Sequence, residues 1–134
     1  MIDSGGKEVK MNKRQFSLWY YTVSHRQALI RSVGKDGKEN IDIYFGDVHY
    51  IDIPTTIDGL EIRDPSDSDK EYISHKIGDL MADLKITVLE HNMQKFYVVS
   101  SIVKIKRNTL AFYELPFDIP SDMGKMFYKP EIID

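Results

Sequence analysis

The sequence contains no cysteine and no apolar run long enough to cross a membrane as a helix. The lack of cysteine excludes a disulfide framework, a thiolate metal site and a cysteine nucleophile, so packing alone must stabilise the fold. A membrane helix needs about 18 consecutive apolar residues, and the N-terminus also lacks the apolar segment of a signal peptide. We therefore expect a soluble, cytoplasmic protein that does not bind a membrane.

Charge of both signs is present, but it is unevenly distributed. Residues 1–40 carry eight Lys or Arg and four acids, whereas residues 41–92 carry four Lys or Arg and twelve acids. Because an acidic segment repels a phosphate backbone, nucleic-acid binding is disfavoured. One form of nucleic-acid binding stays open as a hypothesis. In it, tyrosines would stack on the bases of a single strand beside the cations Lys104, Lys106 and Arg107.

The most informative stretch is KFYVVSSIVKIK at residues 95–106, where apolar side chains occupy both alternating faces of a strand before Lys104 and Lys106. A strand that is apolar on both faces is typical of the centre of a sheet. Residues 85–90 and 109–115 predict neighbouring strands. We expect a helix to cover the face with Phe96, Val98 and Ile102, and the opposite face to line another interior, through Tyr97, Val99, Val103 and Ile105.

Turn residues divide the preceding chain into further strands. Residues 16–23 and 28–33 predict a hairpin with its turn at 24–27, and Gly34–Lys38 is the strongest turn signal because Asp-Gly readily adopts positive φ. A strand should start at Asn40, with a bulge at Gly46–Asp47 where the apolar alternation changes phase. A turn at Asp58–Gly59 should then lead into a short strand at 60–63.

One helix is predicted, from Asp69 to about Leu84. Apolar residues recur there at helical spacing, at Ile73, Ile77, Leu80, Met81 and Leu84. Ser68 and Glu71 have the spacing of a capping box, in which each side chain binds a free backbone amide at the start of the helix.

Together these elements predict an α+β fold that is predominantly β. We expect a strongly curled antiparallel sheet or small barrel of about seven strands, with the one helix packed on it. Residues 1–14 should form a flexible N-terminal tail, residues 15–115 a single β-rich domain, and residues 116–134 an extended C-terminal tail packed on the domain or trailing from it.

No catalytic motif is evident, and we assign no catalytic residue, metal site or cofactor. The four histidines have no metal-binding spacing, and no serine lies in a Gly-x-Ser-x-Gly turn. The one suggestive polar group is Asp47, His49 and Asp52, since a carboxylate beside an imidazole can orient it.

Aromatic residues are plentiful, with eight Tyr, six Phe and one Trp. Adjacent residues of a strand point to opposite faces, so at least one of Trp19, Tyr20 and Tyr21 should face outward unless both faces are covered. Exposed Tyr and Trp are common at interfaces and ligand sites. Our candidate binding residues are Trp19, Tyr21, Asp47, His49 and Tyr50.

These features favour a non-catalytic protein-interaction or regulatory binding module. Its acidic middle would complement a basic partner, which would be another protein or a second copy of the chain. The alternative is a small-molecule-binding barrel or an enzyme with a pocket inside the curled sheet, using His49 and neighbouring Asp or Tyr side chains.

Overall fold

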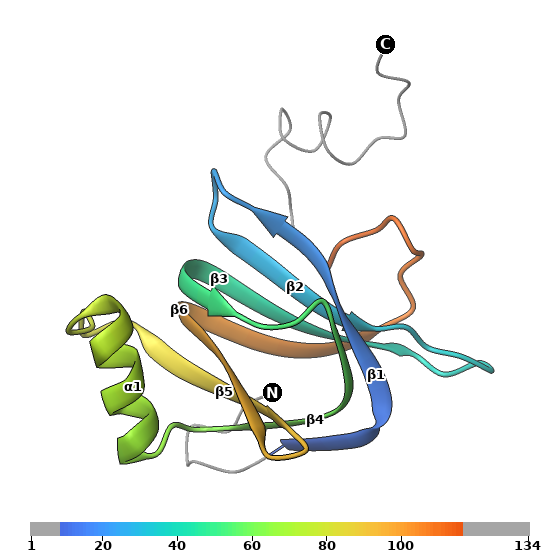
Figure 1. Cartoon of the computed structure of the whole chain (residues 1–134). Helices are drawn as coiled ribbons and strands as arrows, with labels where there is room; N and C mark the ends of the chain where they lie inside the picture. The colour runs from blue at the N-terminus through green and yellow to red at the C-terminus, as the bar shows by residue number, and fades with distance from the viewer. Residues whose placement is uncertain (1–8, 117–134) are drawn as a thin grey trace.

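The computed structural model describes residues 9–116 and contains six strands and one helix in that range (Figure 1). The elements are β1 (Val9–Thr22), β2 (Gln27–Ser32), β3 (Asn40–Asp52), β4 (Thr56–Arg63), α1 (Asp67–Ile77), β5 (Lys85–His91) and β6 (Gln94–Asn108). The strands form a closed antiparallel barrel in the order β1-β2-β3-β6-β5-β4. The predicted class, α+β and predominantly β, is confirmed.

The long strand β1 closes the barrel because it pairs with two neighbours. Its first half pairs with β4, from Val9 opposite Ile62 to Ser17 opposite Thr56, and its second half pairs with β2 as far as Thr22 opposite Gln27. Register shifts in both ladders let the strand bend between its partners. β1 begins before the expected domain start at residue 15. Of the expected tails, residues 1–14 and 116–134, the parts at 1–8 and 117–134 lie outside the described residues.

Two of the predicted turns are confirmed. Residues 23–26 join β1 to β2, and the β2–β3 turn has positive φ at Asp36 (54°) and Gly37 (81°). Gly34 is required beside this turn, since an added Cβ would clash with the carbonyl oxygen of Lys38. Asp58–Gly59 was wrongly predicted as a turn, because both residues lie inside β4.

The bulge in β3 lies slightly later than predicted. Asp47 has a positive φ of 55°, and the register with β6 shifts between Val48 and Tyr50. As a result Val48 packs in the barrel core, whereas Tyr50 packs against a second cluster of buried residues on the outside of the barrel.

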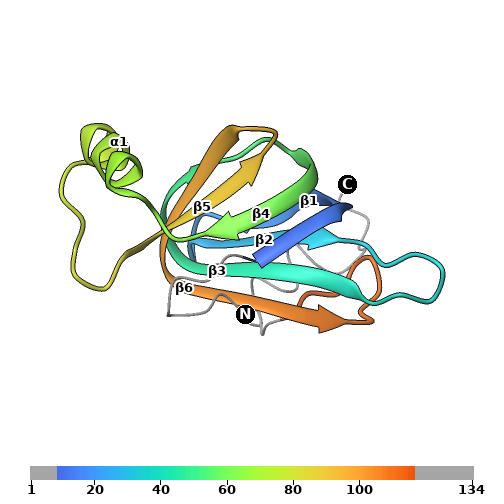
Figure 2. The ribbon, with the colours of Figure 1, turned by 90° about the horizontal axis from the view of Figure 1, so that it is seen from below.

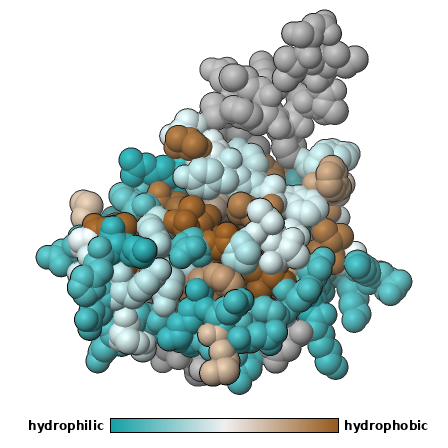
Figure 3. Space-filling model, in the orientation of Figure 1, coloured by the Kyte–Doolittle hydropathy of each residue, from teal (hydrophilic) through white to brown (hydrophobic). Residues whose placement is uncertain are grey.

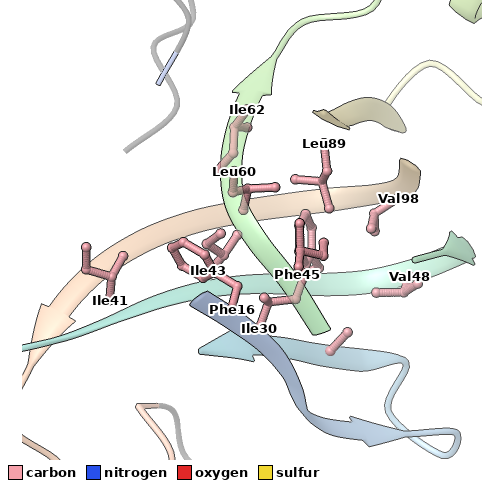
Figure 4. Packing of buried hydrophobic residues seen from close by; sticks show 12 residues of the cluster. Phe16, Ile30, Ile41, Ile43, Phe45, Val48, Leu60, Ile62, Leu89 and Val98 are labelled. Carbon is pink, nitrogen blue, oxygen red and sulfur yellow. The ribbon is translucent and has the colours of Figure 1, made fainter. Parts of the chain in front are cut away.

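The barrel interior is filled by a cluster of twelve buried side chains, among them Phe16, Ile43 and Phe45 (Figure 4). All six strands contribute to the cluster. Burial of this apolar surface is the main favourable contribution to folding.

α1 lies outside the barrel beside β5 (Figure 2). Its buried Ile73 belongs to the second cluster, together with Ile86, Val88, Tyr97 and Val99. Our assignment of the faces of β6 was therefore wrong: Tyr97 and Val99 lie under the helix, and Phe96 and Val98 face the barrel core. The alternation of residues along β6 shows which side chains share a face. Because both faces are apolar, it does not indicate which face points into the barrel.

The expectation for residues further along β6 was partly wrong as well. Ile102, which we placed under the helix, is 42% exposed. Val103 and Ile105 do line an interior, but it is the barrel core rather than the surroundings of Tyr97 and Val99.

The helix is shorter than predicted and starts at a different capping box. Ser66 is the N-cap: its hydroxyl accepts a bond from the Asp69 amide, and the Asp69 carboxylate accepts one from the Ser66 amide. Gly78 ends the helix with a φ of 80°. The predicted seventh strand at 109–115 is also wrong, since those residues contain a turn and no strand.

Candidate functional site

An open groove lies between α1, the 78–84 loop and β5. We call it the α1–β5 groove; its volume is about 570 Å³, within the roughly 300–1,000 Å³ that is usual for binding pockets. Its lining includes Lys70, Ser74, Leu80, Leu84, Lys85 and Ile86. The groove exists because Gly78 stops the helix, after which Leu80 and Leu84 pack against the second cluster from a loop.

The groove combines apolar contact area with a few charges. The apolar part of its lining consists of Leu80, Leu84 and Ile86. The charged part consists of two acids, Asp64 and Asp79, and two lysines, Lys70 and Lys85. No histidine is among the described residues that line it. Its chemistry therefore suits non-covalent contact with an apolar group that has polar neighbours.

Exposed apolar side chains continue the apolar area beside the groove. Ile77 is 37% exposed and Met81 is 66% exposed, on either side of the short segment that contains Gly78 and Leu80. Apolar residues also gather in the middle of the face shown in Figure 3, above a hydrophilic lower half. Clustered exposed apolar surface is typical of interaction sites.

A buried carboxylate fixes the helix that forms one wall of the groove. Asp69 is 1% exposed and accepts bonds from the Tyr97 hydroxyl (2.8 Å), Arg63 (3.0 Å) and Lys95 (3.2 Å). Burial raises the pKa of Asp69, but hydrogen bonds from Ser66, Tyr97 and Arg63 outweigh burial and hold the pKa below its usual range. These contacts tie the start of α1 to β4 and β6.

The tyrosines under α1 donate rather than ionise. Burial, and then the hydrogen bond to Asp69, raise the pKa of Tyr97 well above its usual value. Tyr97 also stacks on Tyr72 of α1, with ring centroids 5.1 Å apart. Burial and the neighbouring Asp52 raise the pKa of Tyr50. These rings support the helix and do not line the groove.

The bulge of β3 separates two of the candidates, Asp47 and His49, from a third, Tyr50. Asp47 and His49 are paired at 3.1 Å and lie at the surface, while Tyr50 packs against the second cluster. Asp52 influences Tyr50 rather than joining His49. The four described cavities have neither Asp47 nor His49 in their lining.

Trp19 and Tyr21 belong to a different part of the surface. The Trp19 ring lies edge-on to Phe112 with centroids 5.4 Å apart, and its indole N–H donates to the Phe112 carbonyl at 3.1 Å. Arg31 lies over the same ring, 5.5 Å from its centroid. Tyr21 is 43% exposed. The candidates from the sequence therefore do not form one site.

Sequence reasoning missed the buried pair of Arg31 and Asp42, each 1% exposed, at the outer wall of the barrel. Arg31 donates twice to the Asp42 carboxylate, at 2.7 and 2.9 Å, and also to the Glu114 carbonyl at 2.9 Å. The pair faces away from the core cluster and holds the segment after β6. Only the register of β2 on β3 places Arg31 opposite Asp42, and no local signal predicts it.

Within residues 9–116, no group of three or more His, Asp or Glu side chains is placed to hold a metal ion. The same residues include no helix that is long and apolar enough to span a membrane. No protein-family model, curated protein or solved structure matches the chain.

Proposed function

We propose that the protein is a non-catalytic binding module whose α1–β5 groove receives an apolar side chain of another protein. The observation that carries the proposal is the apolar part of the groove, Leu80, Leu84 and Ile86, which is open to solvent beside a helix fixed on the barrel. We expect this binding to take place in the cytoplasm.

Binding outside the barrel is favoured because its interior is already occupied by the twelve side chains of the core cluster. A ligand inside the sheet would have to displace buried residues such as Phe16 and Phe45, at a cost of several kcal/mol. The pair of Asp47 and His49 lines none of the four described cavities, which favours the groove over this pair as the binding site.

The charge around the groove favours a basic partner segment. Residues 64–87 carry six acids and three lysines, and of these acids Asp69 is buried and already paired. The remaining acids would attract Lys or Arg on either side of the bound apolar side chain, which raises the association rate and selects the partner. We therefore expect the bound segment to contain a large apolar residue between basic ones.

Selection from a displayed library of random peptides tests this proposal. We expect the immobilised protein to enrich peptides in which an aromatic or aliphatic residue is flanked by Lys or Arg. Ser74→Trp should block the groove from an exposed helix position without disturbing the core, and should weaken binding of an enriched peptide about tenfold or more.

The matched control is His75→Trp, which adds the same ring at a neighbouring exposed position outside the groove lining. It should leave peptide affinity unchanged. Enrichment of peptides that bind both variants equally well would place binding elsewhere and refute the proposal.

A further inference from the structure

A turn after β6 presents two exposed aromatic side chains. We call residues 110–114 the aromatic turn; within it Phe112 is 78% exposed and Tyr113 is 62% exposed. The turn is closed by two bonds between Ala111 and Glu114: the Glu114 amide donates to the Ala111 carbonyl at 2.9 Å, and the Ala111 amide donates to Glu114 Oε1 at 2.8 Å. Its aromatic rings are therefore displayed by a defined backbone.

The barrel wall holds this backbone at three further points. Arg31 donates to the Glu114 carbonyl at 2.9 Å, Asn40 donates to the Leu110 carbonyl at 2.9 Å, and Trp19 donates to the Phe112 carbonyl at 3.1 Å. Since the turn is ordered before binding, little conformational entropy is lost when Phe112 enters a partner. Large rings presented in this way are typical of residues that dominate an interface.

Cations outnumber acids in two cavities of the barrel wall, one that reaches Pro116 after the aromatic turn and one that contains Arg31, which bonds to the turn. Lys104 and Lys106 line a cavity of about 270 Å³ together with Pro116, which follows the turn directly. A second cavity, of about 320 Å³, is lined by Arg31 and by further cations, namely Lys13, Arg14, Lys35 and Lys38. Among the acids in the two linings, Asp42 is paired with Arg31, which leaves Asp36.

The aromatic turn and the α1–β5 groove lie on opposite sides of the barrel, as the orange segment and α1 show in Figures 1 and 2. The groove, if it functions as proposed above, takes an apolar side chain flanked by basic residues. The aromatic turn supplies the apolar ring, Phe112; its own charged residue is Glu114, and the cations Lys104 and Lys106 of β6 line the cavity that reaches Pro116 at its end. We infer that a second copy of this chain is a partner, and that its Phe112 docks in the α1–β5 groove.

This contact would be head-to-tail, because the two surfaces differ and lie on opposite sides of each copy. Each added copy then leaves one groove and one aromatic turn open, so association continues with concentration rather than stopping at a dimer. The surface charges have opposite sign on the two sides, so added salt should weaken the association.

Sedimentation velocity of the full chain, from micromolar to millimolar concentration, tests the inference. We expect the wild type to show species that grow with concentration. Phe112→Ser should weaken self-association about tenfold or more by removing the inserted ring, and Ser74→Trp should do the same by filling the groove. Val23→Ser, which replaces another exposed apolar residue (77% exposed), is the matched control and should behave like the wild type.

Mixing the two defective variants gives the deciding measurement. Phe112→Ser retains a groove and Ser74→Trp retains an aromatic turn, so the mixture should form a one-to-one dimer that cannot grow. A mixture that stays monomeric would overturn the head-to-tail contact, as would a wild type that remains monomeric throughout. If the wild type is monomeric but still binds the enriched peptides through the groove, self-association fails while the proposed function stands.

Discussion

Two buried charged clusters hold segments against the outside of the barrel, and they are built differently. Asp69 anchors α1 through Arg63, Lys95 and Tyr97, whereas Arg31 anchors the aromatic turn and depends on one carboxylate, Asp42. Arg63 also binds Glu90, and the Lys95 side chain is 37% exposed, so both keep a partner or solvent if Asp69 is lost. Arg31 and Asp42 are each 1% exposed, and without Asp42 the Arg31 guanidinium would keep only neutral acceptors, the carbonyls of Ala111 and Glu114.

The comparison teaches that redundancy, rather than burial alone, decides how much a buried charge matters. The penalty for leaving a buried charge without its counter-charge is several kcal/mol, and it is smaller where water or a second group of opposite charge can reach the charge. The variants below test this difference in order of decreasing effect.

Asp42→Ala should have the largest effect. It leaves the Arg31 guanidinium buried without its carboxylate, and we expect the free energy of unfolding to fall by about 3–5 kcal/mol in urea titrations. The double variant Arg31→Met/Asp42→Leu removes both charges and should lose less than Asp42→Ala alone. A double variant that is the less stable of the two would contradict the explanation based on an unpaired charge.

Asp69→Asn should have a smaller effect, a loss of about 2 kcal/mol, because Arg63 keeps Glu90 and Lys95 turns to solvent. The measurement is again urea unfolding at neutral pH. A loss equal to that of Asp42→Ala would show that redundancy does not protect this cluster.

The effect of Asp69 should also depend on pH. Its pKa in the folded protein lies below the ordinary 3.8, so its contribution is complete above that value and is lost as pH falls toward the folded pKa. The difference in stability between the wild type and Asp69→Asn should be constant from about pH 5 to 7 and shrink below about pH 4. A difference that stays constant down to pH 2 would refute this prediction.

Ser66→Ala should have the smallest of the three effects, about 1 kcal/mol, through loss of the N-cap bond to the Asp69 amide. Ser68→Ala is the matched control: Ser68 is already inside the helix, and the variant removes only the exposed bond between the Ser68 and Ser66 hydroxyls, so thermal unfolding should show little change for it. Equal losses at the two positions would count against Ser66 as the cap.

The error in the helix start illustrates what local patterns resolve. Two pairs of residues have the three-residue spacing of a capping box: Ser66 with Asp69, and Ser68 with Glu71. The two helix starts that they predict differ by about half a turn of helix. The structure selects Ser66 because only Asp69 reaches Arg63, Lys95 and Tyr97 on the barrel. Tertiary partners therefore decided between two locally equivalent caps.

The candidate site was the least predictable part of the molecule. Its apolar lining comes from Leu80 and Leu84, which have helical spacing and which we placed on the helix. Gly78 ends the helix before them, and the resulting loop stands off β5 and leaves a groove. A glycine inside a helical pattern was the available signal, although glycine is tolerated at such positions.

Apart from the wrong strand at 109–115, the sequence by itself determined where the six barrel strands lie, the two confirmed turns and the predominance of β structure, because alternation and turn residues act over a few neighbouring positions. Tertiary structure alone decided that Tyr97 and Val99 lie under α1, that Arg31 meets Asp42, and that a groove opens beside β5. Each of these three arrangements depends on which strands pair and on which of their faces point into the barrel. The central strand β6 is apolar on both faces, so its local sequence does not indicate which face points inward.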